Sequence, residues 1–392
     1  MAGINFFPKL LDMKPTDRYF TAMPLYHSSA SVLGVCQALG AGCAIVVAPK
    51  FSPRTYMKMV CETQATIIQY IGEACRYLLS APPGPYDRAH KVRVAFGNGM
   101  RPDVWQRFKD RFAIPDVCEF YGATEGPGAS FVYERNGFLR GAIGRSGSVI
   151  QGLFGGLSVL VKHDHNTDMP FRDPKTNFCI KSPRNETGEL LSQLDPSGIA
   201  DKFQGYLGND KASGSKILYD VFKKGDAYYR TGDLQRLDSD GRWWFIDRIG
   251  DTFRWKSENV STAEVSEALG SHPAIREANV YGVQLPHHDG RAGCAALGLV
   301  EGKVLDAGMR QELAALARKR LPRYAVPLFL RVMHDVEVTG TLKHQKVVLR
   351  NEGVDPAKMG DDELFWLPPG AESYEPFGKK EWARVEGGSA KL

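Results

Sequence analysis

The amino-acid sequence predicts an α/β protein, in which a large domain of β-sheets flanked by helices precedes a small α+β domain at the C-terminal end. Apolar runs alternate with amphipathic segments from Arg18 to about Ile246, which is the pattern of an α/β domain. After Asp247, short strand and helix patterns mix within a shorter stretch. With 392 residues, 43% of them hydrophobic, the chain is long enough to bury a core in each domain.

Strand and helix signals follow one another in the first part of the large domain. Short runs rich in β-branched and aromatic residues predict strands at Ile45–Val47, Thr66–Tyr70, Val92–Phe96 and Val117–Tyr121. Amphipathic segments predict helices at Arg54–Glu62 and Pro102–Phe112. The uncharged stretch from Pro24 to Pro49 contains several serines and the Gly40-Ala41-Gly42 break, so it predicts a helix and a strand rather than a membrane span.

The second part of the large domain and the small domain are predicted in the same way. Short strands are expected at Leu157–Val161 and Gly188–Leu191, and a hairpin turn at Asp238-Ser239-Asp240-Gly241. Ser261 and Glu264 have the spacing of a capping box and predict a helix that Gly270 ends. The small domain continues with strands at Ala278–Val283, Ala292–Val300 and Leu328–Val332, and a helix at Met309–Leu321. The region after Pro356 is rich in proline, glycine and charge, which predicts a mostly irregular tail.

Charge and cysteine usage exclude several function classes. The net charge is +5, and its basic residues are scattered without aromatic interleaving, so nucleic acid is not an expected partner. The seven cysteines include no Cys-x-x-Cys pair, which favours a reducing compartment. Charges at Lys9, Asp12 and Lys14 interrupt any apolar region long enough for a secretory signal.

The segment Phe120-Tyr121-Gly122-Ala123-Thr124-Glu125-Gly126 is the sharpest chemical signal in the chain. It is an apolar strand that runs into a glycine turn, and it offers an aromatic ring, a hydroxyl for phosphate and a carboxylate for Mg²⁺ on nearby residues. An ordinary turn at the end of a strand is the alternative interpretation.

Two further segments point to a nucleotide. In Tyr229-Arg230-Thr231-Gly232-Asp233, the carboxylate that follows a glycine turn suits the two vicinal hydroxyls of a ribose, and the arginine of Asp247-Arg248 suits a phosphate. Gly97-Asn98-Gly99 follows a strand and lets the backbone approach a planar ligand. Each of these patterns alone is more typical of a surface turn or ion pair.

Taken together, these segments resemble the adenylate-forming superfamily, and within it the fatty acid transport protein/very-long-chain acyl-CoA synthetase family. The motifs that carry the resemblance are Pro24-Leu25-Tyr26-His27-Ser28, Gln69-Tyr70-Ile71-Gly72-Glu73, Phe120 to Glu125, Tyr229 to Asp233, Asp247 to Lys256, and Thr339 to Lys346. The resemblance covers the chain from about Asp17 to Pro356.

The resemblance implies a role for each matching residue. Tyr121 would stack on adenine beside Gly97, Asn98 and Gly99, and Asp233 would bind the ribose hydroxyls. Thr124 would contact the α-phosphate, Glu125 would help to hold Mg²⁺, and Arg248 would lie near the ribose and the α-phosphate. His27 would lie beside the acyl group, and Lys343 is the nearest substitute for the superfamily's catalytic lysine, whose position is Thr341 here.

The resemblance also implies a reaction and a domain organisation. A fatty carboxylate would attack the α-phosphate of ATP, and CoA would then attack the acyl-adenylate, so ATP, Mg²⁺ and CoA are the expected cofactors and co-substrates. The expected domains are a partial AMP-binding domain at 1–249, a small domain at 250–356 after a hinge at Gly250, and a tail at 357–392. Ser257 replaces the glycine that relatives have near the CoA tunnel.

Two further features of the sequence lead to expectations. The glycine-rich phosphate loop that the family has upstream of Tyr26 is not in this sequence, so we expect the large domain to be incomplete at its N-terminus and adenylation to be weak. The alternative function is a catalytically inactive nucleotide- or acyl-binding remnant. The ending Ala390-Lys391-Leu392 resembles a peroxisomal import signal, which implies the import receptor as a partner. Peripheral contact with a membrane is a further expected interaction.

Overall fold

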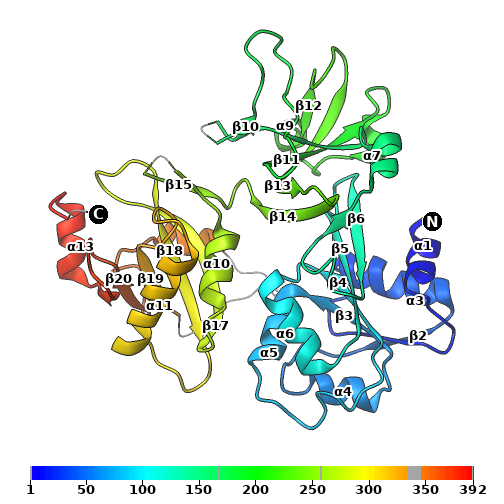
Figure 1. The fold of residues 1–392 in the computed structure, drawn as a ribbon, viewed down its shortest axis with the longest axis horizontal. Coiled ribbons are helices and arrows are strands. Elements are labelled where there is room, and N and C mark those ends of the chain that lie inside the picture. Colours follow the sequence, from blue (N-terminus) through cyan, green and yellow to red (C-terminus); the bar gives the residue numbers. More distant parts are fainter. Residues whose placement is uncertain (1, 166, 257, 334–345, 391) are drawn as a thin grey trace. The chain divides into compact units, whose positions relative to one another are not determined.

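The computed structural model describes residues 2–165, 167–256, 258–333, 346–390 and 392. Contacts within the chain divide it into two compact units, Met1–Ile246 and Asp247–Leu392, which Figure 1 shows in blue to green and in yellow to red. The boundary lies three residues before Ile249, where the sequence predicts the large domain to end.

The first unit is built on a six-stranded sheet with the strand order β2-β1-β3-β4-β5-β6. Its strands are β1 (Arg18–Thr21), β2 (Ala44–Val47), β3 (Ile67–Ile71), β4 (Val94–Asn98), β5 (Asp116–Gly122) and β6 (Ala129–Glu134). The first five strands run parallel, and β6 pairs antiparallel with β5. Because parallel strands need crossover connections, helices cover both faces of this sheet.

Each face of the sheet buries its own cluster of apolar side chains. One cluster joins the strands to α4 (Tyr56–Glu62), α5 (Gly72–Ser80) and α6 (Pro102–Phe112), with Trp105 and Phe108 fully buried. The other joins them to α1 (Ala2–Leu10) and α3 (Cys36–Ala41) through Phe7 and Ala38. The sheet therefore forms the middle layer between two layers of helices, as Figure 1 shows.

A second six-stranded sheet, largely antiparallel, completes the first unit. Its order is β7-β14-β13-β11-β8, and β12 also pairs with β13. The strands are β7 (Gly144–Arg145), β8 (Ser158–Val161), β11 (Thr187–Leu194), β12 (Ile217–Tyr219), β13 (Ala227–Leu237) and β14 (Arg242–Arg248). The predicted turn after Asp238 joins β13 to β14, and Gly241 there has a φ of +77°, which glycine adopts without strain.

Shorter elements connect these sheets. They are α2 (Ser28–Ala30), the π-helical turn η1 (Ser31–Val35), α7 (Ser148–Phe154), α8 (Ile199–Lys202), α9 (Asp210–Ser215), and the two-stranded pair β9 (His163–Asp164) and β10 (Met169–Pro170). The uncharged stretch from Pro24 to Pro49 is thus divided among short helical segments and β2. No helix among the described residues is both long enough and apolar enough to cross a membrane.

The second unit has a five-stranded sheet with helices packed against it. Its strands are β17 (Ile275–Gln284), β18 (Arg291–Leu299), β19 (Phe329–Val332), β20 (Glu363–Trp366) and β21 (Glu375–Pro376), and β15 (Phe253–Trp255) pairs separately with β16 (Glu258–Val260). The helices are α10 (Thr262–Gly270), α11 (Ala307–Arg320), α12 (Lys346–Glu352) and α13 (Lys379–Glu386). As the capping pattern predicts, Ser261 accepts a hydrogen bond from the backbone N–H of Glu264 at 3.2 Å.

The region after Pro356 is mostly irregular, as the sequence predicts, but it also contains β20, β21 and α13 and packs within the second unit. Strand β20 continues the sheet of the second unit beside β19, and its Phe365 and Trp366 are buried in the same core as Phe329. An ion-pair network supports the connection, because Arg331 donates to Glu352 at 2.7 Å and to Asp362 at 2.6 Å. Four-residue strands between proline and glycine turns are too short for a clear periodic signal, so only the neighbouring strand reveals them.

Candidate active site

The predicted site residues of the first unit gather where the parallel strands end. Strands β3, β4 and β5 end at Ile71, Asn98 and Gly122, and they are adjacent in the sheet. In open parallel sheets, ligands bind outside the carboxyl ends of the strands, because the backbone and the following loops are accessible there. The loops after these strands carry the glycine segment 97–99 and the segment 120–126.

The loop Gly97–Met100 is held very tightly. A Cβ on Gly97 would lie 2.0 Å from the carbonyl oxygen of Tyr70, and a Cβ on Gly72 would lie 1.7 Å from that of Gly99. From the neighbouring strand, Glu119 accepts hydrogen bonds from the backbone N–H groups of Gly99 and Met100. Glycine is therefore required at two positions by close approach of the backbone, independently of any ligand.

A chain of polar contacts ties the segment after His27 to these loops. Ser28 Oγ lies 3.0 Å from Thr124 Oγ1, which joins two predicted segments 96 positions apart. Ser29 Oγ donates to Asn98 Oδ1 at 3.2 Å, and the buried Gln69 donates to the carbonyl oxygen of Ser29 at 2.5 Å. The hydroxyls of Ser28 and Thr124 therefore form one polar surface, suited to oxygen atoms of a ligand.

His27 is at the beginning of this segment. Its Nδ1 accepts a hydrogen bond from the backbone N–H of Ser29 at 3.1 Å, so it caps α2. The side chain of Tyr26, immediately before it, is 80% exposed. The contact with Ser29 holds the ring of His27 in place. Ser28, whose hydroxyl contacts Thr124, is the next residue in the sequence.

Tyr121 and Asp233 meet although they are 112 positions apart. The phenol of Tyr121 donates to Asp233 Oδ2 at 2.6 Å. Burial and the negative charge of Asp233 both raise the pKa of Tyr121, so its phenol stays protonated and remains a donor. Gly232, with a φ of +76°, lies within β13, where the pairing with β11 shifts register, so the glycine turn predicted before Asp233 is an irregularity inside a strand. The aromatic ring and the carboxylate therefore form a preformed pair on the edge of the site.

Glu125 is exposed, and its carboxylate is contacted by Tyr206, a residue outside the predicted motifs. Tyr206 donates its phenolic O–H to Glu125 Oε1 at 3.1 Å, and burial followed by the charge of Glu125 raises the pKa of Tyr206. The described residues contain no group of three or more carboxylate, histidine or cysteine side chains that could hold a metal. Glu125 still fits Mg²⁺, which commonly takes one carboxylate and completes its shell with phosphate oxygens and water.

Arg230, within the predicted ribose segment, has a structural role. Its guanidinium donates to both oxygens of Glu189, at 2.9 and 2.8 Å, and Glu189 is fully buried. Burial raises the pKa of Glu189, but the nearby His163, with Nδ1 at 3.5 Å from Oε2, and the hydrogen bonds from Arg230 outweigh this effect and hold the pKa below its usual value. This buried pair fixes β13 against β11 and so positions the part of β13 that carries Asp233.

The remaining predicted residues belong to the second unit. Arg248 is exposed and its backbone N–H donates to Asp247 Oδ1 at 2.8 Å. Asp247 is buried and accepts from the N–H groups of Thr262 and Ala263, at 2.5 and 3.2 Å, so its carboxylate caps α10. A Cβ on Gly250 would meet no atom within 4 Å. Ser257 and Lys343 lie outside the described residues.

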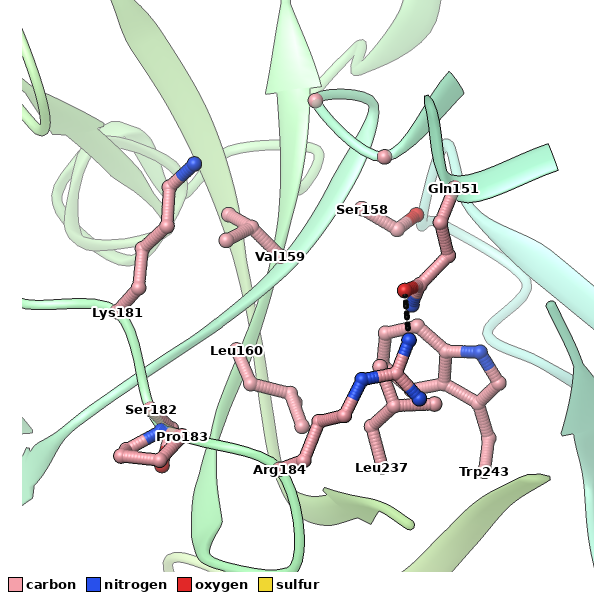
Figure 2. Close-up of a pocket in the computed structure, with 12 residues that line it drawn as sticks. Gln151, Ser158, Val159, Leu160, Lys181, Ser182, Pro183, Arg184, Leu237 and Trp243 are labelled. Atoms are coloured by element: carbon pink, nitrogen blue, oxygen red, sulfur yellow. Dashed lines mark hydrogen bonds between the residues drawn. The ribbon is translucent and has the colours of Figure 1, made fainter. Parts of the chain in front are cut away.

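A separate cavity of about 320 Å³ lies on the second sheet of the first unit. Its floor is apolar, with Leu160 and Trp243, and Figure 2 shows Lys181 and Arg184 extending from the same loop on two sides of it. Arg184 donates to Gln151 Oε1 at 2.5 Å, the contact drawn as a dashed line. The residues that line this cavity are different from the predicted site residues.

Three residues of the site, Glu119, Gln69 and Tyr206, received no role from sequence reasoning. Glu119 lies between Cys118 and Phe120 on a strand that is mostly buried. The only sequence signal of a special role was therefore a charged residue within an apolar run. Gln69 has the same kind of signal within β3. Tyr206 follows a glycine in a polar loop, which is typical of any surface turn.

Comparison with families of known proteins gives two matches. A model described as AMP-binding enzyme matches residues 1–193, and one described as AMP-binding enzyme C-terminal domain matches residues 264–343. Among curated relatives, a very long-chain fatty acid transport protein of Cochliobolus heterostrophus is 47% identical over 96% of this chain and 58% of its own length. Isopenicillin N epimerase component 1 of Hapsidospora chrysogena is 45% identical over 98% of this chain and 65% of its own.

Two further comparisons concern a second transport protein and a solved structure. A very long-chain fatty acid transport protein of Saccharomyces cerevisiae is 41% identical over 100% of this chain and 59% of its own length, so the chain spans about three fifths of such relatives. Among solved structures, an anthranilate CoA ligase in complex with anthranoyl-AMP has a TM-score of 0.71 at 17% identity, over 90% of this chain and 62% of that one. The adenylate-forming fold predicted from the sequence is thereby confirmed.

Proposed function

Because the chain belongs to the family of AMP-binding enzymes, we propose that it takes part in activating a long or very long fatty acid to its CoA thioester. The observation that carries this proposal is the 2.6 Å hydrogen bond between Tyr121 and Asp233. It brings an aromatic ring suited to adenine next to a carboxylate suited to ribose, from two motifs far apart in the sequence. The names of the curated relatives support a fatty acid as the acid substrate.

Different residues of the first unit would bind different parts of the nucleotide. Adenine would lie on Tyr121 beside the loop Gly97–Gly99, and the ribose hydroxyls would donate to Asp233. Thr124, paired with Ser28, would donate to an oxygen of the α-phosphate. Glu125, held by Tyr206, would contribute one ligand to a magnesium ion that neutralises phosphate charge.

The proposed reaction has two steps. In the first, a carboxylate oxygen of the fatty acid forms a bond to the α-phosphorus of ATP, the bond to the β-phosphate oxygen breaks, and pyrophosphate leaves. In the second, the CoA thiolate forms a bond to the acyl carbon and AMP leaves with the electron pair of the broken C–O bond. In the second unit, Arg248 would act at the phosphate, Lys343 would act at the reacting carboxylate, and Ser257 would lie at the CoA entrance. Gly250 would be the hinge between the steps, because glycine tolerates a wide range of backbone angles.

Pyrophosphate exchange tests the first step. Purified chain, ATP, Mg²⁺, palmitate and labelled pyrophosphate should give labelled ATP. The variant Asp233→Asn should bind the nucleotide about 30-fold more weakly, so it should lower the exchange rate at limiting ATP by a similar factor. Adding CoA and detecting palmitoyl-CoA by mass spectrometry tests the second step. A panel of acids that includes short aromatic and peptide carboxylates would reveal a different acid substrate, as the isopenicillin N epimerase component among the relatives makes worthwhile.

The alternative function is nucleotide or acyl-group binding without catalysis. It would be indicated if calorimetry detects AMP or a non-hydrolysable acyl-adenylate analogue while neither exchange nor thioester formation is measurable. Binding of neither ligand would contradict the proposed function, because Tyr121, Thr124 and Asp233 of the first unit should bind AMP.

We also propose peroxisomal delivery through the ending Ala390-Lys391-Leu392. In the second unit, Ala390 is buried and its N–H donates to the carbonyl oxygen of Arg384 at 3.0 Å, so a receptor would have to detach this segment. A fluorescent protein fused upstream of Met1 should colocalise with peroxisomes, and deletion of Leu392 should disperse it. A diffuse signal from the undeleted fusion would contradict this localisation.

A further inference from the structure

Glu119 is a buried carboxyl group directly beneath the loop Gly97–Met100. It lies on β5, opposite Gly97 of β4 in the parallel register, and only 1% of it is exposed. Its Oε1 accepts from the N–H of Gly99, and Met100 N lies 3.3 Å from each of its oxygens. The phenol of Tyr70 donates to Oε2 at 2.5 Å.

These contacts restrict the backbone of the loop on two sides. On the side of β3, the backbone of the loop is already in close contact with Tyr70 and Gly72. Glu119 takes the two N–H groups that the turn at Gly99, with a φ of +77°, directs into the protein. Without this acceptor, the two N–H groups would be buried and unsatisfied, and the loop would have to open toward the ligand side to reach water.

We propose that Glu119 is a positioning residue for nucleotide binding, which holds the loop Gly97–Met100 in the shape that receives a planar base. The inference rests on the proposed function, since it takes this loop as the adenine-binding loop. Asn98, at the centre of the loop, also receives the hydroxyl of Ser29, so the same anchor stabilises the polar contacts around Thr124. Glu119 would act through the loop and would not touch the nucleotide.

The hydrogen bonds that Glu119 accepts determine which substitution is informative. Burial raises the pKa of Glu119 to about 8, although the hydrogen bonds from Tyr70, Gly99 and Met100 favour the ionised form. In either protonation state, Oε1 is the oxygen that accepts from both backbone donors. Glutamine has the same shape and keeps that oxygen, whereas methionine has a similar volume and offers no comparable acceptor.

The chain contains a matched control. Glu134 on β6 is likewise 1% exposed, and it accepts from the backbone N–H groups of Gly137 and Leu139 in a turn. It pairs with Val117 at the beginning of β5, away from the strand end that carries the site. Loss of this acceptor should destabilise the fold by the same mechanism without disturbing the loop Gly97–Met100.

Calorimetric titration with AMP tests the inference. Glu119→Met should weaken AMP binding by roughly 10- to 100-fold, since two backbone hydrogen bonds that shape the loop are lost. Glu119→Gln should stay within about threefold of the unmodified chain, because the acceptor is retained. Glu134→Met should lower thermal stability but leave AMP affinity unchanged. Equal AMP affinities for Glu119→Met and the unmodified chain, or equal losses in Glu119→Met and Glu134→Met, would overturn the inference.

Amide hydrogen exchange gives an independent readout that needs no folded Glu119→Met variant. The N–H groups of Gly99 and Met100 should exchange as slowly as those inside β4, although they lie in a loop. Exchange at the rate of an exposed loop would refute the anchor. If the unmodified chain binds no AMP, the proposed function fails, while slow exchange at these two positions would still establish that Glu119 holds the loop.

Discussion

Replacing Asp233 by asparagine isolates the charge that the site offers to a ribose. The carboxylate accepts from the Tyr121 phenol at 2.6 Å, and in the nucleotide complex it would accept from two ribose hydroxyls. A hydrogen bond to a charged acceptor contributes about 1.5 to 3 kcal/mol, and one to a neutral acceptor about 0.5 to 1.5 kcal/mol. The substitution therefore removes about 1 kcal/mol for each hydroxyl. For two hydroxyls the loss is about 2 kcal/mol, or about a 30-fold higher Kd for AMP.

The assay is calorimetric titration with AMP and with 2′,3′-dideoxy-AMP. The dideoxy nucleotide lacks both hydroxyls, so the unmodified chain and Asp233→Asn should bind it with equal affinity. Asparagine keeps an oxygen for the Tyr121 phenol, so the free energy of unfolding should change by less than about 1 kcal/mol. Asp233→Ala should abolish detectable AMP binding, because it also frees the Tyr121 ring.

Asp226→Asn is the structural control for this experiment. Asp226 accepts from the backbone N–H groups of Val221, Phe222 and Lys223 just before β13, so its loss should destabilise the fold and leave AMP affinity unchanged. The assignment of Asp233 to ribose would be refuted if Asp233→Asn binds AMP as tightly as the unmodified chain. It would also be refuted if the affinities for AMP and for the dideoxy nucleotide fall equally.

Three other outcomes are expected from the structure. Arg331→Met should lower the free energy of unfolding by about 3 to 5 kcal/mol in urea, because two carboxylates lose their buried cation, and Asp362→Asn should restore part of it. The pKa of Glu189 is lowered by its partners, so its contribution is present above the unfolded pKa of about 4.3 and is lost as pH falls through the folded value. The stability advantage over Glu189→Gln should therefore shrink below about pH 4, and a constant difference would contradict the lowered pKa. Gly250→Ala should leave the stability of the second unit unchanged, since a Cβ meets no atom within 4 Å, and a hinge role would appear only as slower thioester formation from preformed acyl-adenylate.

Local patterns in the sequence determined most elements and the main motifs. Helix α6 has the predicted bounds Pro102–Phe112, because amphipathic period and an N-terminal proline are properties of neighbouring residues. The same holds for the strand and turn that carry Tyr121, Thr124 and Glu125, where an apolar run simply ends at glycine. Resemblance in these motifs then indicated the family, which the comparisons confirmed.

Only the tertiary structure decided which side chains hold those motifs in place. Tyr206 and Glu125 are 81 positions apart, and the anchor of the loop Gly97–Met100 is a glutamate on the next strand, 20 positions beyond Gly99. The membership of β20 in the five-stranded sheet of the second unit likewise depends on its pairing with β19. A hydrogen bond between distant segments leaves no periodic trace in the sequence, because either partner alone is an ordinary polar residue, and only folding brings the donor and the acceptor within reach.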